Sequence, residues 1–188
     1  MLTTANLITL FRIAMVPAFV LSFIYMPGRP AIRWAGFLIF TVAAVLDAVD
    51  GFVARMFRQK SQLGAFLDPL ADKLLMTTVY VLGVGYGIPH YVSVLVVSRD
   101  VLIVIGWASL YYFDRDTEIR PIWISKFNTA CQFVTACLFL LNIALSTEGG
   151  VPEGFLKIAL NVTVSTTLIS GAACFADWYK RMGGFTRV

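Results

Sequence analysis

Six apolar stretches of roughly 20 residues each follow one another along this chain, and each is long enough to cross a bilayer as a helix. They cover residues 6–26, 33–57, 64–87, 91–113, 124–146 and 155–178. Segments rich in proline, glycine or polar residues separate them. Lipid offers the backbone no hydrogen-bond partner, so only helices and closed barrels span it, and no alternating barrel pattern is present. We therefore predict an all-α integral membrane protein of about six transmembrane helices.

The composition supports a membrane protein with no soluble appendage. Of the 188 residues, 59% are hydrophobic and only 14% are charged, which leaves too little polar surface for a soluble domain of this length. We expect one membrane domain over residues 1–188. The net charge of +4 is modest, so we attribute it to topology and to contact with the lipid bilayer, with no nucleic-acid partner.

The basic residues predict the orientation. They gather in the second and fourth loops and in the C-terminal tail, as Arg58, Lys60, Arg115, Arg120, Lys126, Lys180, Arg181 and Arg187. The positive-inside rule then places both termini in the cytoplasm. Arg29 and Arg33 in the first loop run against this rule.

Four aspartates interrupt the second and third apolar stretches. Asp47 and Asp50 are spaced i, i+3, and Asp68 and Asp72 are spaced i, i+4, so each pair lies on one helix face. The two helices are antiparallel neighbours joined by the short segment "FRQKSQ". Asp50 and Asp68 each lie on the order of 10 Å from this loop, which allows the two pairs to face each other near the cytoplasmic interface.

Divalent cations explain this cluster best. A charged side chain within the bilayer costs about 2.5–3.5 kcal/mol, and neighbouring carboxylates raise one another's pKa. Oxygen ligands suit two Mg²⁺ or Mn²⁺ ions that share a carboxylate. Two alternatives stay open: a proton relay, and simple ion pairing with Arg55, Lys73 and Arg99.

Small residues accompany the aspartates. Gly51 and Gly64 are unfavourable in helices by about 1 kcal/mol each relative to alanine. Together with Ala54 they leave room for a ligand, although close helix packing would use the same residues. Arg55 can bind phosphate with two hydrogen bonds. Cations, a gap and an arginine describe a diphosphate site.

The residues "DAVDGFVAR", eight further residues and "GAFLDPLAD" form the pattern D-x-x-D-G-x-x-A-R-x8-G-x-x-x-D-x-x-x-D. This pattern resembles the signature of the CDP-alcohol phosphotransferases, with no position missing. The similarity extends to "NLITLFRI" in the first helix and to the six-span layout. It implies a membrane enzyme of phospholipid synthesis that transfers the phosphatidyl group of CDP-diacylglycerol to an alcohol and releases CMP.

The resemblance also implies roles for individual residues. Asp47, Asp50 and Asp68 would bind the cations, and Asp72 would contact one cation and act as the base for the acceptor hydroxyl. Gly51, Ala54, Arg55 and Gly64 would form the nucleotide pocket, and Asn6 and Arg12 would orient the diphosphate.

The acceptor is harder to assign. "LGAFLDPLADKLL" resembles both cardiolipin synthases and phosphatidylglycerol phosphate synthases, whereas "SRDVLIV" is more similar to the cardiolipin branch. Trp107 stands where the glycerol-phosphate enzymes typically carry an arginine. These features favour phosphatidylglycerol, followed closely by glycerol 3-phosphate. Lys73, Arg99 and Lys126 are the predicted contacts of this anionic acceptor, with Asp100 expected to point to another helix face than Arg99.

Another class of protein also carries intramembrane aspartates. An ion- or proton-coupled transporter would use them for coupling, but such a chain often contains two matching halves, and this one has a single acidic cluster. The enzyme interpretation implies location in the inner (cytoplasmic) membrane of a bacterium, with the active site facing the cytoplasm. It also allows a homodimer.

Overall fold

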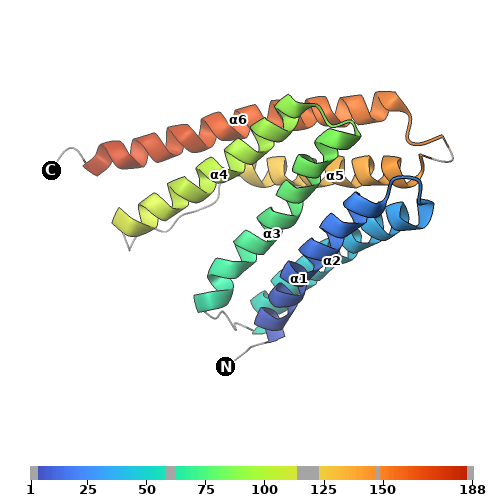
Figure 1. Cartoon of the computed structure of the whole chain (residues 1–188). Helices are drawn as coiled ribbons and strands as arrows, with labels where there is room; N and C mark the ends of the chain where they lie inside the picture. Colours follow the sequence, from blue (N-terminus) through green and yellow to red (C-terminus); the bar gives the residue numbers. More distant parts are fainter. Residues whose placement is uncertain (1–3, 58–61, 114–122, 147–148, 186–188) are drawn as a thin grey trace. The chain divides into compact units, whose positions relative to one another are not determined.

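The computed structural model describes the backbone of residues 4–57, 62–113, 123–146 and 149–185, and within these ranges all regular elements are helices, joined by short turns. Side chains are described for residue 11 and for 13–46, 73–106, 123–146 and 149–179. The six α-helices are α1 (Thr4–Tyr25), α2 (Pro30–Phe57), α3 (Gln62–Gly83), α4 (His90–Phe113), α5 (Trp123–Ala144) and α6 (Glu153–Phe185), shown in Figure 1. The predicted all-α class and the six helix positions are confirmed, and α6 continues beyond the predicted end at residue 178.

Two of the described helical segments, Trp123–Ala144 and Glu153–Tyr179, are long and apolar enough to cross a membrane by length and composition. Large apolar side chains are also exposed on other helices, for example Val94 and Leu102 of α4. An exposed apolar surface of this extent is unusual for a soluble monomer and is consistent with a membrane protein.

The helices form two compact units. Unit 1 contains residues 1–87 and 136–151, and unit 2 contains residues 88–135 and 152–188, so α5 contributes to both. In unit 1, α1 packs against α2 and α3. In unit 2, α4 packs against α6.

Aromatic packing holds unit 1 together at the end where α1 meets α2. Phe19 and Phe40 are fully buried, with ring centroids 6.1 Å apart. Phe23 packs 5.0 Å from Phe19 and edge-on to Tyr86, which follows α3 in the short helix η1 (Val84–Tyr86). The Tyr86 hydroxyl donates a 2.8 Å hydrogen bond to the Phe23 carbonyl. Each such aromatic pair contributes about 0.5–1.5 kcal/mol beyond its buried area.

A ladder of buried polar side chains joins α5 to α6 in unit 2. The Thr135 and Thr163 hydroxyls are 2.8 Å apart, and the Gln132 amide donates to Thr167 at 3.4 Å. Asn128 Oδ1 accepts hydrogen bonds from Thr166 (2.8 Å) and Thr167 (3.0 Å). In an apolar medium, hydrogen bonds of this kind hold helices together where the hydrophobic effect cannot.

Candidate functional site

The signature residues lie on two helices joined by a short connection. The segment 47–55 belongs to the C-terminal part of α2, and the segment 64–72 belongs to the N-terminal part of α3. Both segments are helical, as the predicted spacings require, and the placement of each aspartate pair on one helix face stays a prediction. Residues 57 and 62 are five Cα steps apart, or at most about 19 Å, so these two helix ends are held near each other.

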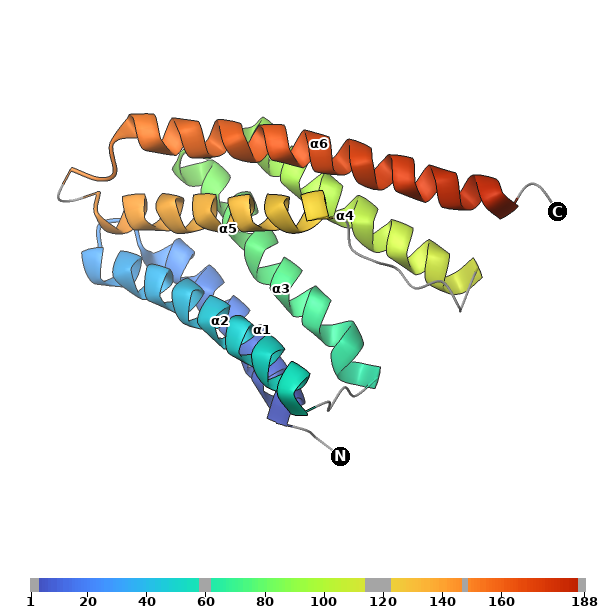
Figure 2. The ribbon, with the colours of Figure 1, turned by 180° about the vertical axis from the view of Figure 1, so that it is seen from behind.

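The N-terminal half of α1 lies at the same end of unit 1. Both ribbon views show α1 starting close to where α2 ends and α3 begins (Figures 1 and 2). The backbone therefore brings together three segments that the sequence marks as functional: the start of α1 with Asn6 and Arg12, the end of α2 and the start of α3.

The predicted catalytic, metal and nucleotide side chains lie outside the part of the chain whose side chains are described. They are Asn6, Arg12, Asp47, Asp50, Gly51, Ala54, Arg55, Gly64, Asp68 and Asp72. Within the described part, no group of three or more His, Cys, Asp or Glu side chains could hold a metal ion. The predicted ion ligands are the four motif aspartates, and their mutual facing stays a prediction.

Arg99, one of the predicted acceptor contacts, is buried in α4 of unit 2. Only 4% of its surface is exposed, and its Nη1 forms a 2.7 Å ion pair with Oδ1 of the equally buried Asp100. Its Nη2 donates to the hydroxyls of Ser125 (2.6 Å) on α5 and Ser170 (2.7 Å) on α6. Arg99 thus links three helices.

We expect Asp100 to point to a different helix face from Arg99, and this expectation does not include the ion pair that the two side chains form. Adjacent residues leave a helix about 100° apart, but the long arginine side chain bends back to reach its neighbour. A buried guanidinium requires such a partner, because an isolated charge is strongly disfavoured away from water. Sequence reasoning missed Asp100 although the dipeptide "RD" within an apolar helix is itself a signal of such pairing.

The other two predicted acceptor contacts differ in their surroundings. Lys126 lies in the first turn of α5, is exposed, and has its ammonium 5.4 Å from the centroid of the exposed Trp123 ring. This cation–π contact is weak at an exposed site, about 0.5–1 kcal/mol, so the lysine can change partners easily. Lys73 is half-buried on α3, immediately after Asp72. For all three basic residues, contact with an acceptor stays a prediction.

Two buried donors of unit 2 lack a hydrogen-bond partner among the described residues: Arg99 Nε and Asn128 Nδ2. Buried polar atoms are nearly always paired in native structures, if necessary with ordered water. The polar interior of unit 2 therefore has hydrogen-bonding capacity beyond that of its helix-to-helix contacts.

The chain was also compared with known proteins. The sequence profile of the CDP-alcohol phosphatidyltransferase family matches residues 2–170. The chain is 36% identical over 174 residues to the CDP-diacylglycerol–glycerol-3-phosphate 3-phosphatidyltransferase of Escherichia coli K12. The matched region covers 89% of this chain and 93% of that relative. The enzyme of the same name from Shigella sonnei matches equally well. That of Shigella flexneri serotype 5b is 36% identical over 72% of this chain and 75% of its own length.

These matches confirm the resemblance that the aspartate signature indicates. They describe transfer of a phosphatidyl group, a reaction of phospholipid biosynthesis, and they do not support the alternative of an ion- or proton-coupled transporter. The match covers α1 to α5, the first half of α6 and the whole signature on α2 and α3. The chain belongs to the CDP-alcohol phosphatidyltransferase family and is a membrane transferase.

Proposed function

We propose that this protein transfers the phosphatidyl group of CDP-diacylglycerol to glycerol 3-phosphate, which yields phosphatidylglycerol phosphate and CMP. The observation that carries the acceptor assignment is the 36% identity over 93% of the length of the Escherichia coli enzyme named for that reaction. Trp107 and the segment "SRDVLIV" favour the opposite order, with phosphatidylglycerol as the first candidate acceptor and glycerol 3-phosphate as the second. Phosphatidylglycerol, which would make the product cardiolipin, becomes the second candidate.

The donor set of the signature fits two divalent cations. All four side chains at Asp47, Asp50, Asp68 and Asp72 are carboxylates, and hard ions such as Mg²⁺ and Mn²⁺ prefer oxygen ligands. Bound there, the ions would neutralise the diphosphate and stabilise the charge on the departing CMP. We assign Asp47, Asp50 and Asp68 as ligands, with Asp72 contacting one ion.

The chain's own residues would carry the remaining steps. Asp72 accepts the proton of the acceptor hydroxyl while the oxygen of that hydroxyl attacks the phosphorus next to the diacylglycerol. A new phosphorus–oxygen bond forms there, the bond to the CMP phosphate breaks, and CMP leaves with the electron pair. Arg55 binds the diphosphate, while Gly51, Ala54 and Gly64 leave room for the nucleotide.

The remaining assignments concern orientation and the acceptor. Asn6 and Arg12 would orient the diphosphate from α1, whose start lies at the same end of unit 1 as the signature. A phosphomonoester acceptor needs basic side chains, and Lys73, Arg99 and Lys126 are the candidates. Of these, Lys126 is the most exposed. Arg99 is engaged by Asp100, Ser125 and Ser170, so its first role is to hold three helices.

We further propose that residues 1–188 form one membrane domain of six spans, with both termini and the active site on the cytoplasmic side of a bacterial inner membrane. The family match across both compact units and the basic second and fourth loops support this placement. The homodimer implied by the family resemblance stays a prediction.

An acceptor competition tests the function. Purified protein is given CDP-diacylglycerol, a divalent cation, and equal amounts of labelled glycerol 3-phosphate and phosphatidylglycerol, and the lipid products are separated and identified. We expect the label of glycerol 3-phosphate in a phosphatidylglycerol phosphate product. Formation of cardiolipin with no glycerol 3-phosphate incorporation would overturn the acceptor assignment while leaving the reaction class intact.

A further inference from the structure

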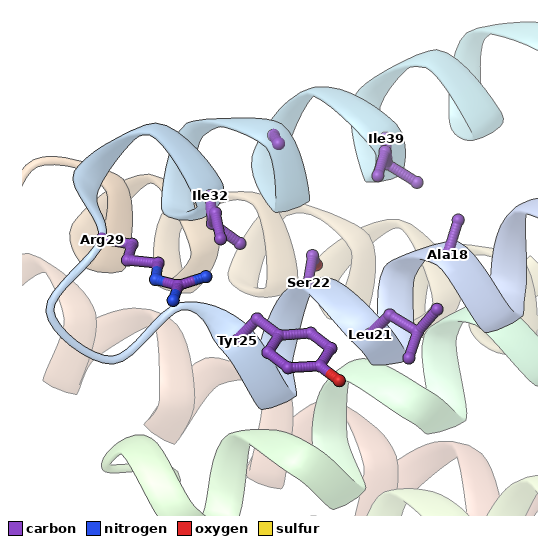
Figure 3. Close-up of a pocket in the computed structure, with 8 residues that line it drawn as sticks. Ala18, Leu21, Ser22, Tyr25, Arg29, Ile32 and Ile39 are labelled. Carbon is purple, nitrogen blue, oxygen red and sulfur yellow. The ribbon is translucent and has the colours of Figure 1, made fainter.

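A groove runs between α1 and α2 at the end of unit 1 where the two helices join. Its volume is about 430 Å³, within the range of small-molecule sites. It is lined by Ala18, Leu21, Ser22, Tyr25, Arg29, Ile32, Ala35 and Ile39 (Figure 3). Apart from Arg29 and the hydroxyls of Ser22 and Tyr25, these described side chains are apolar.

Small residues make this groove. Ala18, Ser22 and Ala35 leave space between the helices, which approach so closely beside them that a Cβ on Gly36 would lie 2.8 Å from the Ser22 hydroxyl. That hydroxyl donates a 2.6 Å hydrogen bond to the Phe19 carbonyl of its own helix. The groove floor therefore behaves as an apolar surface and suits a hydrocarbon chain.

The loop end of the groove carries positive charge. Among the described lining residues Arg29 has the only charged side chain, and Figure 3 shows it beside Tyr25 at this end. The positive end of the α2 dipole begins at Pro30, and the first turn of α2 contains no acidic residue. A tyrosine and an arginine beside an apolar surface are the usual neighbours of lipid headgroups.

The loop end of the groove lies far from the phosphatidyl-transfer signature. Pro30 and Asp47 are 17 residues apart on α2, which corresponds to about 26 Å along the helix axis. Because this is close to the ~30 Å thickness of the hydrocarbon core, the groove opens near the membrane face opposite the aspartates. The positive-inside rule predicts few arginines in loops on this side of the membrane. A binding site for lipid headgroups there explains why the first loop is nevertheless basic.

We propose that the groove binds one acyl chain of an anionic phospholipid, with Arg29 binding its headgroup phosphate beside the positive end of the α2 dipole. The neighbouring Arg33 is engaged differently: its Nη1 donates to the Ser146 hydroxyl, and its side chain does not line the groove. Arg29 and Arg33 carry the same charge and are four residues apart, but only Arg29 faces the proposed lipid. Arg33 is therefore a matched control for Arg29.

Native mass spectrometry of the detergent-purified protein tests the proposal. Phosphatidylglycerol and phosphatidylcholine with identical acyl chains are titrated separately, and binding of the first lipid is compared. Wild type should bind phosphatidylglycerol about fivefold more tightly, the preference expected for one basic side chain near a headgroup. Arg29→Gln should abolish this preference, whereas Arg33→Gln should retain it. Equal preference in wild type and Arg29→Gln would overturn the proposal, as would equal loss in both variants.

A second variant tests the acyl-chain part. Ala18 is exposed in the groove, so Ala18→Phe fills the space without entering the core. It should weaken binding of both lipids several-fold and leave the thermal midpoint within about 2 °C of wild type. Unchanged binding of both lipids would contradict the proposal. If Ala18→Phe instead converts a wild-type dimer into a monomer, the groove is an interface between two copies and the lipid assignment is wrong. Both readouts are independent of the transferase activity.

Discussion

Replacing Asp100 by asparagine should destabilise the protein strongly, because Arg99 would keep its charge and lose its counter-ion. Both side chains are almost completely buried, and their ion pair is 2.7 Å long. Removing one partner of a buried pair costs about 3–5 kcal/mol. Asparagine keeps one acceptor oxygen, and Ser125 and Ser170 still accept from Nη2, so the lower end of this range applies. A loss of about 3 kcal/mol lowers Tm by about 6–12 °C for a chain of this size.

The assay is thermal unfolding in detergent, with an exposed ion pair as the control. Glu153 and Lys157 form a 2.9 Å pair whose side chains are 86% and 72% exposed. Glu153→Gln makes the same chemical change as Asp100→Asn and should not change Tm measurably, because solvent screens such pairs. The double variant Arg99→Gln/Asp100→Asn should recover part of the lost stability, since it leaves no uncompensated charge. If Asp100→Asn unfolds within about 2 °C of wild type, the buried pair does not link the helices of unit 2 as described.

Further substitutions test the signature residues and the packing of α5 against α6. Asp47→Asn or Asp68→Asn should abolish CMP release, as should chelation of divalent cations. The circular dichroism spectrum should stay unchanged in each case. Full CMP release in excess chelator would refute the assignment of the aspartates as metal ligands. Asp72→Asn should retain binding of the CDP-lipid and lose about 10²-fold or more in kcat, because the proton acceptor is removed while an amide oxygen remains to contact the ion. Equal loss of donor binding in Asp72→Asn and Asp47→Asn would make Asp72 a simple ligand. Thr135→Val should lower stability by about 1 kcal/mol and reduce Tm, because the hydroxyl loses its contacts with Thr163 and with the Ala159 carbonyl of α6. Thr78→Val should not lower Tm, because the Thr78 hydroxyl donates to the Leu74 carbonyl of its own helix.

The helices could be predicted well because apolar runs and their punctuation are local signals. Pro30 is the first residue of α2, the helical position at which proline is favoured. Gly87, with a φ of +117°, ends the short helix η1. The aspartate signature likewise depends only on spacing along the chain, within each helix and across the eight residues between its two halves. Its assignment to a family is confirmed by the comparisons, whereas the side-chain roles within it stay predictions.

Contacts between helices could not be predicted in the same way. Asn128, Gln132 and Thr135 are spaced i, i+4, i+7 on α5, and Thr163, Thr167 and Ser170 repeat this spacing on α6. The pattern signals a polar stripe on each helix but does not say which stripe meets which. The Arg99–Asp100 pair depends on a side-chain rotamer, and the α1–α2 groove depends on which small residues face each other. Both are properties of packing and not of periodicity.

Phosphatidyl transfer at the α2–α3 signature requires that one CMP is released for each new lipid, and this ratio can be measured. Purified protein is incubated with CDP-diacylglycerol labelled in both the cytidine and an acyl chain, together with glycerol 3-phosphate and Mg²⁺. We expect CMP and a new anionic lipid to appear in equal amounts, and we expect Asp50→Asn, which alters only a signature carboxylate, to form neither. CMP released without a matching lipid product, or equal turnover by Asp50→Asn, would contradict it.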